Sequence, residues 1–184
     1  VPADHGMGQN EMEPAISTVS ESYSLTHWTM ERSVEFLETR DETRPFFLWT
    51  SFSKPHPPLD PCLHYWLQYK DAEVPPPVYG DWSAEAEWVP PGFRAATSVL
   101  SSCDRFDEAL IKDVRRAYYA LITQIDYNLG RLFARMRELS VLDNTLILFT
   151  SDHGDLLGDH YIGAKGAFLE GSAHVPMLMR VPEA

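Results

Sequence analysis

The sequence has few cysteines, few basic residues and no long hydrophobic run. Its 184 residues include only 2 Cys, which are too few for a disulfide framework. Lys and Arg number 15 against 27 Asp and Glu, so the formal net charge is −12. General binding to nucleic acid or to an anionic membrane needs a basic surface, and a membrane span needs roughly 20 apolar residues in a row. We therefore expect no nucleic-acid partner and no membrane span.

The remaining composition is that of a globular domain. Hydrophobic residues make up 44% and charged residues 23% of the chain, values typical of soluble folds with a sizeable core. The start of the chain, from Val1, contains neither the basic region nor the apolar core of a signal peptide. It also lacks an initiating Met, so we interpret residues 1–184 as a single piece of a longer polypeptide.

Hydrophobic periodicity predicts an α/β fold. Three- and four-residue steps indicate helices over residues 24–40 and 107–139. Apolar, β-branched or aromatic runs indicate strands over 46–52, 145–150 and 174–181. This order is typical of a mostly parallel sheet flanked by helices. So few strands predict a sheet that is incomplete in this chain.

A Pro- and Trp-rich segment, residues 60–102, separates the first strand from the long helix. We expect a long excursion with little regular structure. Long loops in compact proteins are usually functional or disordered, and the tryptophans favour a packed loop.

Polar residues with metal-binding chemistry follow the 145–150 strand. Asp152 and His153 lie where an α/β sheet presents its ligands, just beyond a strand's carboxyl end. A carboxylate and an imidazole together suit a divalent metal. The alternative is a turn made by Asp and Gly, in which the histidine has no role.

Other candidates lie in two loops. Lys165 has small neighbours, so an anion such as sulfate or phosphate could approach its ammonium. His56 stands among prolines that would hold it in place, and its ordinary pKa suits proton transfer near neutrality. Lys54 could help to bind an anion. The alternatives are a solvated lysine and a loop histidine without function.

Together these stretches resemble the sulfatases of the alkaline phosphatase superfamily. The most specific segment is Thr150 to His160, TSDHGDLLGDH. The resemblance covers about residues 24–182 and its other matching segments, in order, are 45–48, 54–58, 118–132, 165–166 and 175–176.

The resemblance implies roles for individual residues. Asp152 and His153 are expected to be the second pair of metal ligands, with His153 where many relatives have Asn. The family implies calcium, but an imidazole would suit manganese or zinc better, so the metal stays open. Lys165 is expected to hold the sulfate oxygens and His56 to contact the sulfate or the leaving oxygen. Lys54 and His160 are expected to contribute to the substrate pocket.

The resemblance also implies parts that this chain does not contain. The family's nucleophile is a formylglycine made from Cys or Ser in a C/S-x-P/A-x-R motif, and neither Cys62 nor Cys103 stands in one. We therefore expect the nucleophile and the first metal-binding pair outside this chain. The chain is then a central to C-terminal piece of the catalytic domain, inactive alone, with the remainder of the same polypeptide as its partner.

The function implied for the intact enzyme is metal-assisted hydrolysis of a sulfate monoester, of a small molecule or a saccharide. One alternative is a phosphonate or phosphate monoester hydrolase of the same superfamily. Another is a non-catalytic scaffold or binding module, in which Asp152 and His153 only shape a turn.

Overall fold

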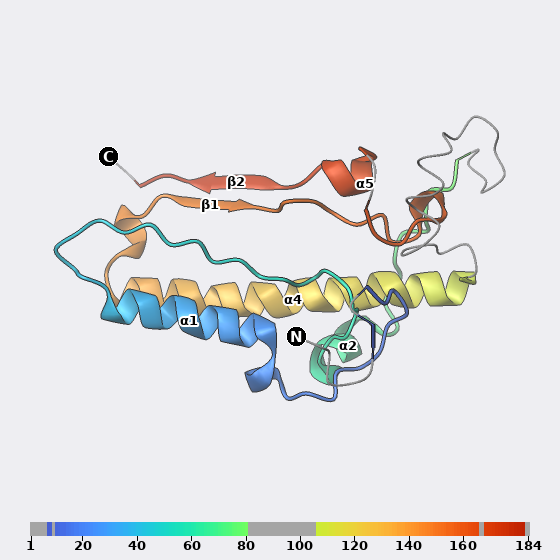
Figure 1. Ribbon diagram of the computed structural model, residues 1–184, viewed down its shortest axis with the longest axis horizontal. Helices are drawn as coiled ribbons and strands as arrows, with labels where there is room; N and C mark the ends of the chain where they lie inside the picture. The colour runs from blue at the N-terminus through green and yellow to red at the C-terminus, as the bar shows by residue number, and fades with distance from the viewer. Residues whose placement is uncertain (1–6, 9, 81–105, 166–167, 183–184) are drawn as a thin grey trace.

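A long helix, α4 (Glu108–Glu138), runs the length of the molecule (Figure 1). The computed structural model describes residues 7–8, 10–80, 106–165 and 168–182. At 31 residues, α4 is about 45 Å long. The Asp107 side chain caps its first turn by accepting from the Leu110 N–H at 2.8 Å. The helix predicted over 107–139 is confirmed to within a residue at each end.

A second helix, α1 (Leu25–Thr39), lies beside the C-terminal half of α4 (Figure 1). The Ser24 side chain caps it and the chain becomes extended at Arg40, so the helix predicted over 24–40 is confirmed to within a residue at each end. Apolar side chains from both helices, together with a residue of the 3-10 turn Leu142–Asn144, form one buried cluster: Leu37, Leu132, Met136 and Leu142.

A second buried cluster surrounds the N-terminal half of α4. Its members are Met12, Leu59, Val114, Ala117, Leu121 and Leu157. Full burial of one such aliphatic side chain contributes about 1.5–3 kcal/mol. Leu59 and Leu157 come from loops that carry predicted site residues, so this half of the helix anchors both loops.

The described strands form an antiparallel pair. β1 (Ile147–Thr150) pairs with β2 (Met177–Arg180), with Ile147 opposite Arg180 and Thr150 opposite Met177. The expectation of a mostly parallel sheet is wrong for these two strands. A parallel neighbour needs a connection that returns along the whole strand. Residues 151–165 and 168–176, which include the short helix α5 (Glu170–Ala173), instead lie beyond the strand end, so the chain enters β2 in the reverse direction (Figure 1).

The strand predicted over residues 46–52 is extended, but pairs with no strand in the part of the chain that the structure describes. Alternate side chains face the helices: Phe46 and Leu48 pack on the α1–α4 cluster. Phe47 and Trp49 point outward and are exposed. The predicted cover by helices is therefore seen on one face only.

The described part of the Pro- and Trp-rich excursion, residues 60–80, contains a helix that the sequence analysis did not predict. Helix α2 (Leu63–Tyr69) packs against α4, with Tyr65 buried. Seven residues between prolines are enough for a short helix when a neighbouring helix covers one face. Residues 81–105 of the excursion lie outside the described ranges. None of the helices described is long and apolar enough to cross a membrane.

Candidate active site

Two predicted residues from distant parts of the chain meet. The Nζ atom of Lys165 lies 2.8 Å from Nε2 of His56. Lys165 follows a hairpin over residues 156–164, closed by three backbone bonds: Leu156 N–H to Ala164 O, Leu157 N–H to Gly163 O and Gly158 N–H to Ile162 O, at 2.9, 3.0 and 2.8 Å. This hairpin register places Lys165 across from Asp155.

Arg115 of α4 fixes the hairpin. Its guanidinium donates to Leu157 O at 3.1 Å and to Asp159 Oδ1 at 2.5 Å. A third bond, 3.1 Å long, runs to Pro75 O. At the hairpin turn, Gly158 has φ 96°, and a Cβ there would lie 2.8 Å from Ile111. A side chain at Gly158 would therefore be strained and would collide with α4.

The His56 loop is held by its own backbone. The ring Nδ1 lies 2.8 Å from Pro57 O, which can only accept, so Nδ1 carries a proton. Nε2 then accepts from the Lys165 ammonium in the neutral ring. Lys54 forms an ion pair with Asp60 and donates to Pro58 O. The predicted substrate contact of Lys54 stays a prediction, because its ammonium is already engaged within its own loop.

The two predicted metal ligands lie next to this pair. The rings of His153 and His56 are 6.1 Å apart between centroids, at an interplanar angle of 70°. Nε2 of His153 lies 3.7 Å from Oδ2 of Asp152, and its Nδ1 lies 2.9 Å from Gly154 O. Partial burial acts to raise the pKa of Asp152, but the nearby His153 charge and hydrogen bonds bring it below its ordinary value. Asp152 is therefore a charged, exposed carboxylate.

These side chains fit half of a metal site. The Asp152 carboxylate and His153 Nε2 face each other closely enough to share one divalent cation, and both donor types are suitable. Within the described ranges no group of three or more His, Cys, Asp or Glu is arranged to hold a metal. Further ligands would have to come from elsewhere in the protein.

His160 lies at the end of the hairpin in a left-handed conformation, with φ 52°. Its N–H donates to Val78 O at 2.9 Å and its Nδ1 lies 3.2 Å from Tyr79 O. These contacts tie the hairpin to the segment that precedes residue 81. The role of His160 in the substrate pocket stays a prediction.

Asp155 belongs to the cluster, but was not among the predicted site residues. Its Oδ1 atom is enclosed and has no hydrogen-bond partner in the described part of the chain. Burial raises the pKa of Asp155 to about 6, although His153, His56 and Lys165 lower it. Burial, with a smaller contribution from Asp155, raises the pKa of the Tyr118 hydroxyl well above its ordinary value. The available sequence signal was an acid two residues after His153, whereas its position across from Lys165 is decided by the fold.

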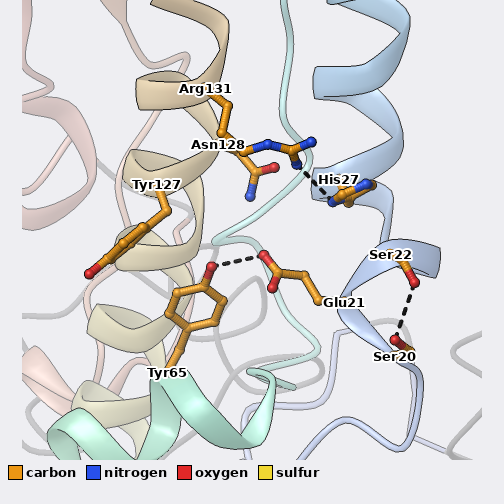
Figure 2. Close-up of a pocket in the computed structure, with 8 residues that line it drawn as sticks. All are labelled: Ser20, Glu21, Ser22, His27, Tyr65, Tyr127, Asn128 and Arg131. Carbon is orange, nitrogen blue, oxygen red and sulfur yellow. Dashed lines mark hydrogen bonds between the residues drawn. The ribbon is translucent and has the colours of Figure 1, made fainter. Parts of the chain in front are cut away.

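A separate hollow of about 410 Å³ lies between the start of α1 and the middle of α4 (Figure 2). The Tyr65 hydroxyl donates to Glu21 across it at 2.8 Å, and Arg131 lies 3.2 Å from His27 Nδ1. None of the predicted site residues lines it, and its charged groups already have ion-pair partners, Glu21 with His64 and Arg131 with Glu31. We therefore place the candidate active site at the His56–Lys165 cluster.

Comparison with known proteins assigns the chain to a family. The Sulfatase family model matches residues 5–184. An arylsulfatase of Clostridium perfringens is 38% identical over 164 residues, which are 88% of this chain and 33% of that protein. A choline-sulfatase of Rhizobium meliloti is 39% identical over 150 residues, or 79% of this chain and 28% of that protein.

A solved structure gives the same assignment for the fold. The phosphonate monoester hydrolase of Agrobacterium radiobacter superposes with a TM-score of 0.83 at 28% identity, over 97% of this chain and 37% of that one. The predicted α/β, alkaline-phosphatase-like fold is thereby confirmed. The chain spans about a third of the length of these relatives. On the family match and these relatives together, the chain belongs to the sulfatase family.

Proposed function

We propose that the whole protein is a metal-dependent sulfatase that hydrolyses a sulfate monoester. The observation that carries this proposal is the 2.8 Å contact between Lys165 Nζ and His56 Nε2, beside Asp152 and His153. A cation, an imidazole and a pair of metal ligands around one point suit an ester of a strong oxyacid, because each can stabilise charge on an oxygen. Membership in the sulfatase family supports sulfate as the acid.

Lys165 binds the sulfate. Its ammonium donates to the non-bridging oxygens, whose charge is redistributed as the ester bond breaks. The carbonyl of Pro57 holds the His56 ring by its Nδ1–H, so Nε2 stays pointed at the same space. With the sulfate bound at Lys165, the neighbouring Nε2 of His56 faces the leaving oxygen. In its protonated form His56 delivers a proton there as the sulfur–oxygen bond breaks.

Asp152 and His153 would hold a divalent metal, which supplies Lewis-acid stabilisation of the transferring oxygens when bound. We propose calcium, with manganese or zinc as alternatives because of the imidazole. The nucleophile would be a formylglycine outside this chain. Relatives named arylsulfatase and choline-sulfatase favour a small sulfate ester, and a sulfated saccharide is the other substrate class that we expect.

The test is turnover of 4-nitrophenyl sulfate by the whole protein, with Ca²⁺, Mn²⁺ or Zn²⁺ added in turn. Lys165→Ala and His56→Ala should each lower kcat/KM by roughly a hundredfold, the usual loss of a charge-stabilising group. Lys70→Ala is the matched control, because that lysine pairs with Asp71 at the surface, and it should keep full activity. Unchanged turnover in the Lys165 and His56 variants would refute the assigned roles.

Metal binding is tested separately by calorimetry. Asp152→Ala should weaken binding of the activating metal, whereas Asp143→Ala, which removes an exposed acid paired with Arg180, should not. If the wild-type protein binds no divalent metal and turns over no ester, the chain would be part of a non-catalytic scaffold.

A phosphonate monoester hydrolase is the second candidate, because the superposition at a TM-score of 0.83 is with such an enzyme. The ratio of kcat/KM for 4-nitrophenyl sulfate to that for 4-nitrophenyl phenylphosphonate decides between them. A ratio above one supports the sulfatase proposal, and a ratio below one supports the phosphonate hydrolase.

A further inference from the structure

The unassigned carboxylate of Asp155 belongs to the same cluster as the candidate active site. The hairpin bond from Leu156 N–H to Ala164 O places Asp155 across from Lys165. On its other side, the Gly154 N–H donates to Ser172 O at 2.9 Å and fixes the backbone. Asp155 therefore has little freedom to leave the cluster.

The enclosed oxygen of Asp155 is unfavourable for stability. An enclosed carboxylate oxygen without a hydrogen bond loses its hydration and receives nothing in return. Groups of this kind are uncommon in folded proteins and often mark a functional position. His153, His56 and Lys165 act on Asp155 to favour its charged form, and Asp152 acts to oppose it.

Positive charge gathers around Asp155. The Lys165 ammonium and the proposed metal would repel one another in a partly desolvated space, where charges interact strongly. One carboxylate among them offsets that repulsion. Without it, the ammonium of Lys165 would move away from His56 and from the proposed cation, toward solvent.

We propose that Asp155 is a positioning residue: its carboxylate keeps Lys165 and His56 together in the arrangement that acts on the ester, without touching the ester. This inference rests on the proposed sulfatase function and adds a residue to it. Removing the Asp155 charge should therefore slow esters with poor leaving groups more than esters with good ones. The reason is that His56 assists the leaving oxygen, and this assistance matters most when the oxygen leaves poorly.

The experiment uses the whole protein and the isosteric variant Asp155→Asn. We expect kcat/KM for 4-nitrophenyl sulfate to fall about tenfold and that for phenyl sulfate about a hundredfold, since general acid catalysis is worth that much or more with a poor leaving group. Asp155→Glu keeps the charge and should keep the wild-type dependence on the leaving group. The double variant with Lys165→Ala should be no worse than Lys165→Ala alone, because Asp155 acts through Lys165.

The matched control is Asp159→Asn in the same hairpin. This acid pairs with Arg115, so its loss should loosen the hairpin and lower turnover of both esters by one common factor. The inference is overturned if Asp155→Asn also lowers kcat/KM for both esters by one common factor. It is also overturned if the losses of Asp155→Asn and Lys165→Ala add fully in the double variant.

A second measurement does not depend on activity. The ¹⁵N resonances of the His56 ring, assigned by their loss in His56→Gln, should show a protonated Nδ1 and an Nε2 acceptor in the wild type. They should shift in Asp155→Asn and not in Asp159→Asn. If the wild type turns over no sulfate ester, the sulfatase proposal fails by itself. An unshifted His56 in Asp155→Asn overturns the positioning role, whatever the substrate.

Discussion

Replacing Arg115 by Met should detach the hairpin over residues 156–164 from α4. The guanidinium is almost fully enclosed, with Arg115 only 8% exposed. It donates three hydrogen bonds, to Leu157 O, to Pro75 O and to Asp159 Oδ1. Methionine would fill much of the same volume, but it provides none of these donors.

The free-energy cost of Arg115→Met can be estimated from Asp159, the ion-pair partner that remains. Removing one member of a buried ion pair typically costs 3–5 kcal/mol, because the other charge stays enclosed and unpaired. The Asp159 side chain is 23% exposed and also accepts from the Val78 N–H at 2.8 Å. Because Asp159 stays partly hydrated, we expect a cost at the lower end of this range, about 3 kcal/mol. This corresponds to roughly a hundredfold increase in the equilibrium constant for opening of the hairpin.

Hydrogen exchange of the whole protein measures this opening locally. The amides of Leu156, Leu157 and Gly158 close the hairpin, so their protection should fall roughly a hundredfold in Arg115→Met. Protection in the C-terminal half of α4 should not change. Because Lys165 follows the hairpin, activity should fall as well.

The neighbouring arginine supplies the control. Arg116 donates to Ala72 O and to Asp113 near the surface, both at 3.0 Å. Arg116→Met should therefore cost about 1 kcal/mol or less. If the two variants lose equal protection in the hairpin, or if Arg115→Met loses none, the enclosed ion pair does not hold this loop.

Three further outcomes follow from local geometry. Gly154→Ala should abolish activity and destabilise the protein, because a Cβ there would lie 2.2 Å from the carbonyl oxygen of Gly171; a soluble, active variant would contradict this. Gly130→Ala, in α4 with nothing within 4 Å of the new Cβ, should instead raise the free energy of unfolding by about 0.5–1 kcal/mol, measured by thermal unfolding. Burial raises the pKa of the Cys62 thiol to about 11, so the thiol should react slowly at pH 8. In a Cys103→Ser background, iodoacetamide should therefore label Cys62 only after urea is added. Rapid labelling of the native protein would disprove the burial.

Local features could be predicted because their causes are local. Helix α4 was found to within a residue, since its apolar steps and its Asp107 cap lie within its own sequence. The position of Asp152 and His153 after β1 followed from an apolar run that ends in polar residues. The excursion was predicted less well: α2 depends on α4 for its cover, which no short window of sequence contains.

The sequence by itself determined the long helix, the strand with its metal-type donors, and a lysine and a histidine suited to an oxyanion. Only the tertiary structure decided that Lys165 and His56, 109 residues apart, share a hydrogen bond, and that one oxygen of Asp155 is enclosed. It also decided that β1 and β2 run antiparallel. The physical reason is range: periodicity and capping act over a few residues, whereas desolvation and charge pairing depend on which distant segments pack together.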